Sequence, residues 1–306
     1  MSLIERRSMY QKTLTRSLKI SGKALHSGRL VDVEIKPAAV NTGIIFKRTD
    51  SHLSKPFKAH AAMITSTELS TTMGEGASCV STVEHLMAAL FLMGIDNALV
   101  EISGPEVPIL DGSAQPFVEK MVQVGTKEQN AFKTSYRVTK EATFSLGASS
   151  IKIEPAEVFS AEVHIDFNRD VIGKQKAVFV QGAPNLDDLV AARTFCHIND
   201  VNAMRRRGLA LGGSLENAVV ISDTGIVNEE GLRSSNEFAE HKLLDLIGDM
   251  YLLGKPLIGK ITAHKPGHTL HANFMWELLG ELSSSLTEET LVFPATTKEQ
   301  ELYAFG

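Results

Sequence analysis

The most constraining feature of this chain is the segment from Glu237 to Leu252, EFAEHKLLDLIGDMYL, whose apolar residues follow a helical period. Its apolar side chains are Leu243, Leu244, Leu246, Ile247 and Met250. They cover so much of the expected helix that its polar residues must run beside a largely buried surface. His241, Asp245 and Asp249 fall at i, i+4 and i+8, so they share one stripe of this helix. Because unpaired charge beside a buried surface is costly, we expect the stripe to be paired or to bind a metal.

A metal site is one interpretation of this stripe. An imidazole and a carboxylate at i and i+4 form a two-point clamp for zinc, which needs a third protein ligand and, in a catalytic site, one open position. The alternatives are a solvated polar stripe and a histidine satisfied by a single carboxylate. This helix therefore supplies only part of any metal site.

A second expected helix carries Glu84 and His85 in its first turn. Ser81 is placed to cap its N-terminus, with Glu84 three residues later as in a capping box, and Gly94 is placed to end it. Neighbouring residues on a helix project about 100° apart. His85 could therefore bind a metal while Glu84 faces a water molecule as a general base. Alternatively, Glu84 only caps its helix and His85 is a half-buried surface residue.

The first part of the chain combines strand and helix patterns. Leu30 to Lys36 alternates apolar and charged residues, and together with Thr42 to Lys47 it predicts a hairpin-like pair of strands. Asn97 to Ile102 predicts a further strand, Ala114 to Val124 a helix, and Lys127 to Thr134 a linker.

Two ordered similarities link the halves of the chain. Lys23 to Ala38 and Glu141 to Ala156 share Ala, Ser, Ile, Pro and Ala at matching positions, and each helix with a Glu-His pair is followed by glycine and a strand. These matches favour an internal duplication, although helix-glycine-strand units are common in α/β proteins. We predict an α+β fold of two similar two-layer domains, residues 1–128 and 129–306, with the active site at their interface. An extra stretch, Ala192 to Val220, has no counterpart in the first half.

Composition excludes several functional classes. The formal net charge of -5 gives the surface no general attraction for nucleic acid or an anionic membrane. Cys79 and Cys196 lie far apart, which excludes a disulfide framework and suits the cytoplasm. The chain opens without a secretory pattern, and its longest uncharged apolar stretch, Leu86 to Ile95, is too short to span a bilayer. Phosphate-binding loops, dinucleotide-binding turns and serine nucleophile elbows have no match in the sequence.

His268 is a candidate general acid. It lies in the turn Lys265 to His268, and an imidazole on a rigid loop can titrate near neutral pH and protonate a leaving group. Asp249 would orient it and keep it charged if the polar stripe reaches this loop. The alternative is an ordinary loop histidine, like its neighbours His264 and His271.

Taken in order, these pieces resemble one family from about Gln11 to Phe293. The matching segments are Leu25–Gly28, Ser81–Leu86, Ile109–Ser113, Ala192–Phe195, Gly212–Asn217 and His241–Asp249. They are similar to the UDP-3-O-acyl-N-acetylglucosamine deacetylase (LpxC) family, the zinc amidases of lipid A synthesis in Gram-negative bacteria. The motifs T-V-E-H-L, A-R-T-F and H-K-[ILM]-L-D-x-I-G-D, in that order, are highly specific to this family.

The resemblance implies a role for each candidate residue. It implies zinc ligands at His85, His241 and Asp245, a general base at Glu84, a general acid at His268 with Asp249 as its orienting partner, and an oxyanion-holding group at Thr194. Lys242 and Lys265 match basic positions of the family's site, and His26 matches a substrate-contacting histidine. By the same resemblance, Phe195 of the A-R-T-F motif would be a further substrate contact, and Phe167 could stack on uracil.

The resemblance also implies two similar α+β domains, and an insert near 196–220 that forms an apolar passage for an acyl chain. The passage would include Val201, Gly213 and Leu215, for which ordinary core packing is the alternative. The implied cofactor is one catalytic Zn²⁺, with Fe²⁺ also possible. The implied partner is a lipidated UDP-sugar, bound by a cytoplasmic monomer with no transmembrane segment and with peripheral membrane contact left open.

Two other functions stay open. One is a metal-stabilised binding module that performs no hydrolysis, and the other is a peptidase or a different amidase. Structural zinc sites are usually rich in cysteine and have four protein ligands. A three-ligand set of two histidines and an aspartate, with Glu84 adjacent, therefore favours catalysis.

Overall fold

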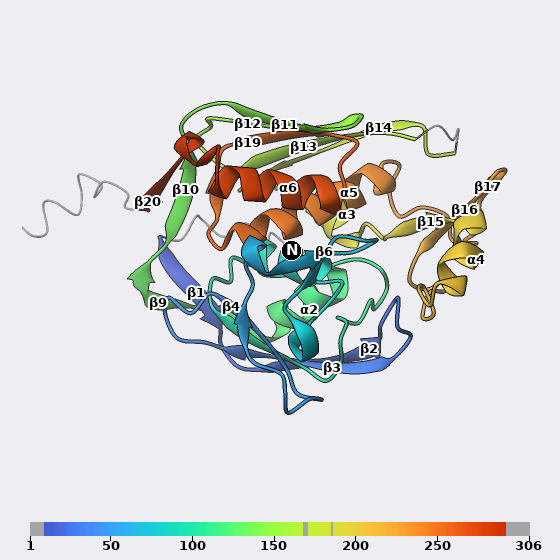
Figure 1. Cartoon of the computed structure of the whole chain (residues 1–306), viewed down its shortest axis with the longest axis horizontal. Helices are drawn as coiled ribbons and strands as arrows, with labels where there is room; N and C mark the ends of the chain where they lie inside the picture. Colours follow the sequence, from blue (N-terminus) through green and yellow to red (C-terminus); the bar gives the residue numbers. More distant parts are fainter. Residues whose placement is uncertain (1–8, 168–170, 185, 292–306) are drawn as a thin grey trace, which may run out of the picture.

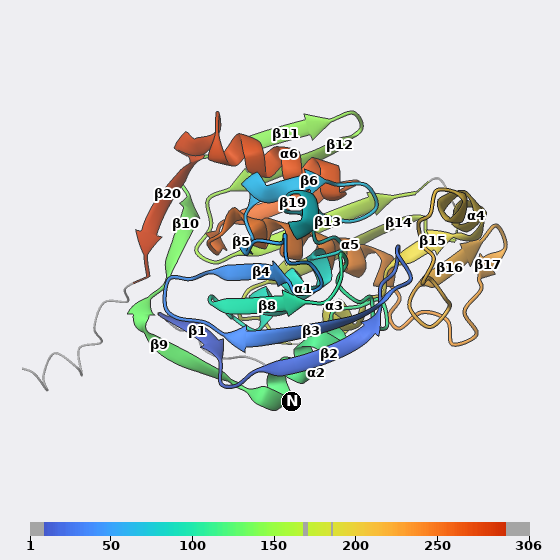
Figure 2. The ribbon, with the colours of Figure 1, turned by 60° about the horizontal axis from the view of Figure 1, so that its bottom comes forward.

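The computed structural model describes residues 9–167, 171–184 and 186–291. Within these ranges the chain combines sheets and helices, which confirms the α+β prediction. Two five-stranded sheets form the outer layers, with helices between them (Figure 1). A smaller group of elements projects at one end of the molecule in both views (Figure 1 and Figure 2). It consists of β15 (Phe195–His197), α4 (Ile198–Arg206), β16 (Val219–Ser222) and β17 (Gly225–Ile226).

The first outer sheet is built from β2 (Leu18–Lys23), β3 (Leu30–Pro37), β4 (Ile44–Arg48), β5 (Phe57–Lys58) and β8 (Ala98–Ile102). Its strand order is β2-β3-β8-β4-β5. The β3 strand is antiparallel to both of its neighbours, whereas β4 is parallel to β8. Val31, Val33 and Ile35 of β3 are buried, because side chains alternate between the faces of a strand.

The second outer sheet is built from β11 (Ala142–Leu146), β12 (Ser149–Glu154), β13 (Ser160–Asp166), β14 (Lys174–Val180) and β19 (Lys260–His264). Its order is β11-β12-β19-β13-β14. The strand directions repeat those of the first sheet, with β12 antiparallel to both neighbours and β13 parallel to β19. Ile35 and Ile153, which the sequence comparison aligned, are both fully buried on the corresponding strands.

The predicted hairpin of residues 30–36 and 42–47 is wrong. Both segments are strands, but β8 lies between them, antiparallel to β3 and parallel to β4. Alternating burial identifies a strand without identifying its neighbour, and here the neighbour comes from much later in the chain.

The predicted linker over Lys127 to Thr134 is also wrong. Most of it forms β9 (Thr126–Phe132), which pairs antiparallel with β1 (Tyr10–Leu14). The strand was missed because most of its residues are exposed and polar. The predicted boundary between residues 128 and 129 falls within β9.

The remaining strands form three small sheets. They are β6 (Ile64–Ser66) with β7 (Thr72–Met73); β10 (Thr134–Val138) between β18 (Leu257–Ile258) and β20 (Leu286–Thr290); and β16 (Val219–Ser222) between β15 (Phe195–His197) and β17 (Gly225–Ile226).

Six α-helices lie in the described part of the chain. They are α1 (Glu84–Leu92), α2 (Gln115–Val124), α3 (Asp187–Ala191), α4 (Ile198–Arg206), α5 (Glu237–Met250) and α6 (His268–Leu279). The α5 helix and its final 3-10 turn confirm the helix predicted from residue 237 to 252. None of these helices is long and apolar enough to cross a membrane.

The predicted cap of α1 is wrong, although its predicted end is confirmed. The helix begins at Glu84 after Val83, without a side-chain cap, while Ser81 forms a parallel bridge with Glu106. Its C-terminal residues are followed by Gly94 at φ +66°, the left-handed conformation that glycine adopts after a helix. The backbone N–H groups in the first turn of α1 therefore have no side-chain cap.

Close contact between α1 and α5 joins the two layers of the molecule. A Cβ atom added to Gly248 of α5 would lie 2.0 Å from the carbonyl oxygen of Glu84, so only glycine permits this approach. Buried apolar side chains form one continuous core that includes both outer sheets and both of these helices. Residues at the start of α1 are thus held directly against the polar stripe of α5.

Candidate metal centre and acid–base site

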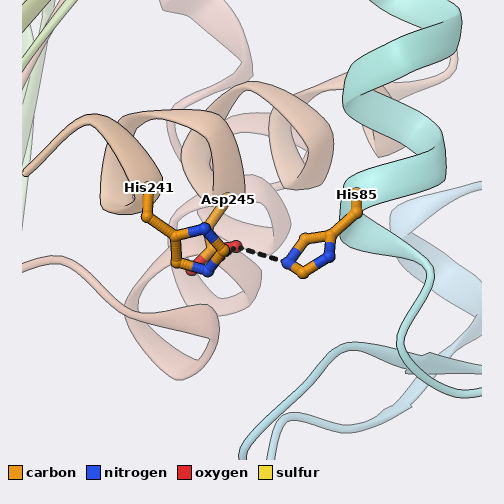
Figure 3. A group of neighbouring side chains, drawn as sticks. All are labelled: His85, His241 and Asp245. Atoms are coloured by element: carbon orange, nitrogen blue, oxygen red, sulfur yellow. Dashed lines mark ion pairs between the residues drawn. The ribbon is translucent and has the colours of Figure 1, made fainter. Parts of the chain in front are cut away.

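Two facing helices bring His85, His241 and Asp245 together (Figure 3). His241 and Asp245 are one turn apart on α5, and His85 lies in the first turn of α1. The Oδ1 atom of Asp245 lies 3.5 Å from Nε2 of His85 and 3.5 Å from Nε2 of His241. One ligand atom from each residue lies within 4.8 Å of the other two, so the three side chains could bind one ion.

The remaining contacts of these side chains leave the inward-facing atoms available to a metal. Nδ1 of His241 donates to the carbonyl oxygen of Ala192 at 3.0 Å, which leaves the Nε2 lone pair facing the cluster. Lys242 Nζ donates to Oδ2 of Asp245 at 2.9 Å, whereas Oδ1 is buried without a hydrogen-bond partner among the described residues. Two imidazole nitrogens beside an unsatisfied carboxylate oxygen fit zinc, and ferrous iron accepts the same donors.

Burial and nearby charge set the protonation of the cluster. Burial lowers the pKa of His241 to about 3, against the attraction of Asp245, so its imidazole is neutral as a metal ligand must be. Burial alone would raise the pKa of Asp245, but its electrostatic interactions with His241 and Lys242 hold it well below its usual value. The cluster therefore presents a neutral imidazole at His241 and an ionised carboxylate at Asp245.

Glu84 lies directly beside the cluster and is buried. Its Oε2 atom accepts a hydrogen bond from the backbone N–H of Thr71 at 3.0 Å, and its Oε1 atom lies 3.8 Å from Nε2 of His268. Burial raises the pKa of Glu84, an effect that the positive charge of His268 reduces. A carboxylate with a raised pKa is a stronger base, which suits proton abstraction from water.

His268 is the first residue of α6 and does not lie in the loop that the sequence suggested. The Pro-Gly pair before it was interpreted as part of a turn, but it ends directly at the helix start. Nδ1 of His268 donates to Oδ2 of Asp249 at 2.8 Å, and the hydroxyl of Thr71 donates to Oδ1 of the same carboxylate at 2.7 Å. The polar stripe of α5 thus reaches His268.

The charges around His268 keep its ring protonated. Burial alone would lower the pKa of His268, but Asp249 and Glu84 raise it to about 9. This gain also outweighs the helix N-terminus, where a cation is unfavourable. Burial opposes ionisation of Asp249 as well, yet the attraction of His268 lowers its pKa to about 2.

Thr194 lies on a segment that is fixed on both sides. Its backbone N–H donates to Gly112 O at 2.8 Å, and its carbonyl oxygen accepts from Val219 N at 2.8 Å. Preceding it, the buried guanidinium of Arg193 pairs with Glu237 at the start of α5, with Nε to Oε1 at 2.8 Å. This ion pair was missed because an isolated arginine and glutamate carry no spacing signal in the sequence.

Phe195, Phe167 and Lys242 extend the site beyond His241. The ring centroid of Phe195 lies 6.2 Å from that of His241 and 5.7 Å from that of Phe167. Lys242 Nζ lies 5.6 Å from the centroid of Phe195. Lys265 pairs at 3.4 Å with Asp166, the residue that precedes Phe167.

His26 contacts the insert instead of the histidine–aspartate cluster. Its backbone N–H donates to Oε1 of Glu106 at 2.6 Å, and its Nδ1 accepts from the N–H of Ala210 at 3.4 Å. Burial lowers the pKa of His26, against the attraction of Glu106. Of the residues predicted to line an acyl passage, Val201 and Gly213 are half-buried and Leu215 is exposed, so the passage stays a prediction.

Thr71 and His271 are polar neighbours of the site that the sequence did not single out. Thr71 contacts both Glu84 and Asp249, and His271 donates from Nδ1 to Oδ2 of Asp249 at 2.8 Å. Nothing local marks Thr71, whereas the spacing of His268 and His271 at i and i+3 would have marked His271 once α6 was recognised.

The fold and the site define an α+β protein with a buried His–His–Asp cluster that could hold a metal, and with Glu84 and His268 beside it. A sequence model described as LpxC, UDP-3-O-acyl N-acetylglycosamine deacetylase, matches residues 11–280. The chain belongs to this family.

Three similar proteins carry the name UDP-3-O-acyl-N-acetylglucosamine deacetylase. The protein of Acidithiobacillus ferrooxidans is 46% identical over 272 residues, which cover 88% of this chain and 90% of that protein. The protein of Geotalea uraniireducens is 44% identical, with 88% of each chain covered. The protein of Pseudomonas entomophila is 42% identical, with 89% of this chain and 90% of that protein covered.

Proposed function

We propose that this chain is a zinc-dependent deacetylase that hydrolyses the acetamide of UDP-3-O-acyl-N-acetylglucosamine and releases acetate in lipid A synthesis. The observation that carries the proposal is the convergence of His85, His241 and Asp245 beside Glu84 and His268. The names of the relatives supply the substrate. The three-ligand set favours catalysis over a structural metal site, which is usually rich in cysteine and has four protein ligands.

The proposed chemistry divides between the metal site and an acid–base pair. Zinc at the His–His–Asp cluster would polarise the amide carbonyl and make a water molecule more acidic. Glu84 accepts the proton of the attacking water, and the Thr194 hydroxyl donates a hydrogen bond to the carbonyl oxygen as negative charge develops on it. His268, held and charged by Asp249, gives its proton to the nitrogen of the departing amine.

The surrounding residues would bind the rest of the substrate. Lys242 lies next to the metal ligands and can attract the carbonyl side of the substrate, while Lys265 can attract its diphosphate. Phe167 offers an exposed ring for uracil, beside Phe195. We assign His26 and the insert residues Val201, Gly213 and Leu215 to the acyl-chain end of the substrate.

The two halves of the chain are proposed to descend from one duplicated unit. The matching strand order and directions of the two outer sheets support this, as does the pairing of α1 with α5. One chain supplies every residue of the proposed site, so the enzyme is proposed to act as a monomer. The free thiols of Cys79 and Cys196 suit the proposed cytoplasmic location.

Metal content and deacetylation, measured on the same samples, test this function. Wild type is expected to bind about one zinc per chain and to hydrolyse UDP-3-O-acyl-GlcNAc. Glu84→Ala should keep the metal and lose activity, whereas His241→Ala should lose both. Glu119→Gln, which changes an exposed carboxylate of α2, serves as the matched control and should behave as wild type.

Two outcomes would reject the proposal. Stoichiometric zinc without activity in wild type would favour a metal-stabilised binding module or a different amide substrate. Activity retained in Glu84→Ala would remove Glu84 as the general base.

A further inference from the structure

His271 is a fully buried histidine that the proposed mechanism leaves without a role. It lies one helical turn after His268 on α6, so both rings face the same side of the helix. Nδ1 of His271 lies 2.8 Å from Oδ2 of Asp249, and Nδ1 of His268 lies 2.8 Å from the same oxygen. A single carboxylate oxygen therefore serves two imidazole rings.

The partners of the His271 ring define its tautomer. Asp249 is ionised and can only accept, so Nδ1 of His271 carries a proton. Nε2 of His271 is buried and has no hydrogen-bond partner among the residues that the structure describes. A second proton on Nε2 would be a buried donor without an acceptor, which is unfavourable. His271 is thus a neutral donor, in agreement with burial lowering its pKa.

The two histidines consequently differ in charge although they share an acceptor. His268 faces Asp249 and Asp245 from α5 and Glu84 from α1, and these carboxylates stabilise its cation. His271 faces Asp249, with Asp245 and the His268 cation further away. The N–H dipole of His271 points at the oxygen that holds the proton of His268 in place. It therefore offsets part of the negative charge that His268 experiences.

We propose that His271 is a positioning residue for His268: its Nδ1–H fixes Oδ2 of Asp249 in line with the His268 ring and shares that oxygen's charge. This inference rests on the proposed deacetylase function. Without the His271 donor, Asp249 holds the proton of His268 more tightly, so His268 becomes a weaker acid toward the departing amine. The Thr71 hydroxyl still holds the other oxygen of Asp249, so the carboxylate stays in place.

Three substitutions of His271 separate the effect of its Nδ1–H donor from the effect of the size of its ring. His271→Leu removes the donor and keeps an apolar side chain of moderate size. His271→Asn puts an amide N–H near the position of Nδ1, whereas His271→Gln carries its amide out toward the position of Nε2. Zinc content and the melting temperature report whether each variant keeps the metal site and the fold.

Leu and Gln variants are expected to lower kcat about tenfold, with KM within about twofold of wild type. The alkaline limb of their kcat/KM profile should move to higher pH, and an NMR titration of the His268 ring should show the same shift. His271→Asn should restore wild-type values in all three measurements. If His271→Leu does not fold, the contrast between the Asn and Gln variants still decides the question.

Equal behaviour of the Asn and Gln variants, or an unchanged His268 titration in the Leu variant, would overturn the role of His271. Failure of the proposed function gives a different result, because the wild type itself would then be inactive. The NMR titration does not need substrate, so it tests the contact with Asp249 in either case.

Discussion

At the scale of single residues, the charge states within this site depend on shared hydrogen-bond and ion-pair partners. Asp249 accepts hydrogen bonds from Thr71, His268 and His271, so one carboxylate connects a loop, α5 and α6. Asp245 divides its two oxygens between Lys242 and the two histidines. Because each carboxylate is buried, a change in one partner alters the charge balance of the others.

The pH dependence of activity should follow His268. Its pKa of about 9 means that the ring is protonated, and able to act as an acid, below that pH. We expect kcat/KM to be maintained up to about pH 8 and to fall as the pH rises through about 9. A pH–rate profile of wild type and of His268→Gln checks this, since the substitution should remove the alkaline limb along with most activity.

The same group predicts how stability varies with pH. The folded pKa of His268 exceeds the unfolded value of 6.5, so its contribution to the free energy of unfolding is complete below pH 6.5 and is lost as the pH rises through about 9.

In the pH–rate profile, an alkaline limb of His268→Gln at the same pH as in wild type would contradict the assignment of that limb to His268.

At the scale of elements, α2 and α5 were the helices best predicted from sequence. The residues of α5 follow a helical period over their whole length, so His241, Asp245 and Asp249 could be placed on one stripe. Pairing partners were harder to predict, because β8 reaches its place between β3 and β4 from far along the chain. Likewise, β9 was not predicted because its polar residues resemble those of a linker.

The contacts within the site were also only partly predictable from the sequence. The spacing on α5 joined His241 to Asp245, but no pattern within the chain places His85 or Thr71 beside them. Those contacts depend on how α1 and a loop pack against α5. The sequence offered His85 as a possible ligand, and the family resemblance joined it to His241 and Asp245. Hydrophobic periodicity gives no information about the contacts of Thr71 or about the Arg193–Glu237 pair.

The contact between α1 and α5 should be intolerant of any added side chain at Gly248. A Cβ atom there meets the carbonyl oxygen of Glu84 at 2.0 Å, and a backbone atom cannot move aside alone. We expect Gly248→Ala to lower the free energy of unfolding by about 1–3 kcal/mol and to weaken zinc binding, because the ligands on the two helices are forced apart. Denaturant unfolding and a zinc-binding titration measure the two effects.

Gly267→Ala is the matched control for this substitution. Its backbone is extended, and a Cβ atom added there meets nothing within 4 Å. A Gly248→Ala variant as stable as Gly267→Ala would mean that the helices can separate without cost.

At the scale of the whole molecule, the candidate metal ligands lie on both sides of the junction between its layers. His85 comes from α1, which precedes β8 of the first sheet, and His241 and Asp245 come from α5, which precedes β19 of the second. The continuous core already joins the two layers, and a bound ion would add a further link between them.

Metal removal should therefore lower the stability of the whole molecule. An ion that binds only the folded chain, at a free concentration of about 1,000 times its Kd, adds about 4 kcal/mol to the free energy of unfolding. We expect a chelator to lower the melting temperature, and added zinc to restore it. His241→Ala should melt at the chelated wild-type temperature and should not respond to zinc. A melting temperature that is independent of zinc in wild type would exclude this link.

The close fit of α5 against α1 also has a consequence for synthesis on the ribosome. The first sheet needs only β8 to be complete, but the apolar side chains of α1 that face α5 stay uncovered until α5 has emerged. About 145 residues separate Leu92 from Glu237, and at translation rates of roughly 5–20 residues per second they take about 7 to 30 s to make. During that interval the nascent chain exposes the apolar surface of α1 on which α5 later packs, and a chaperone would have this surface to bind.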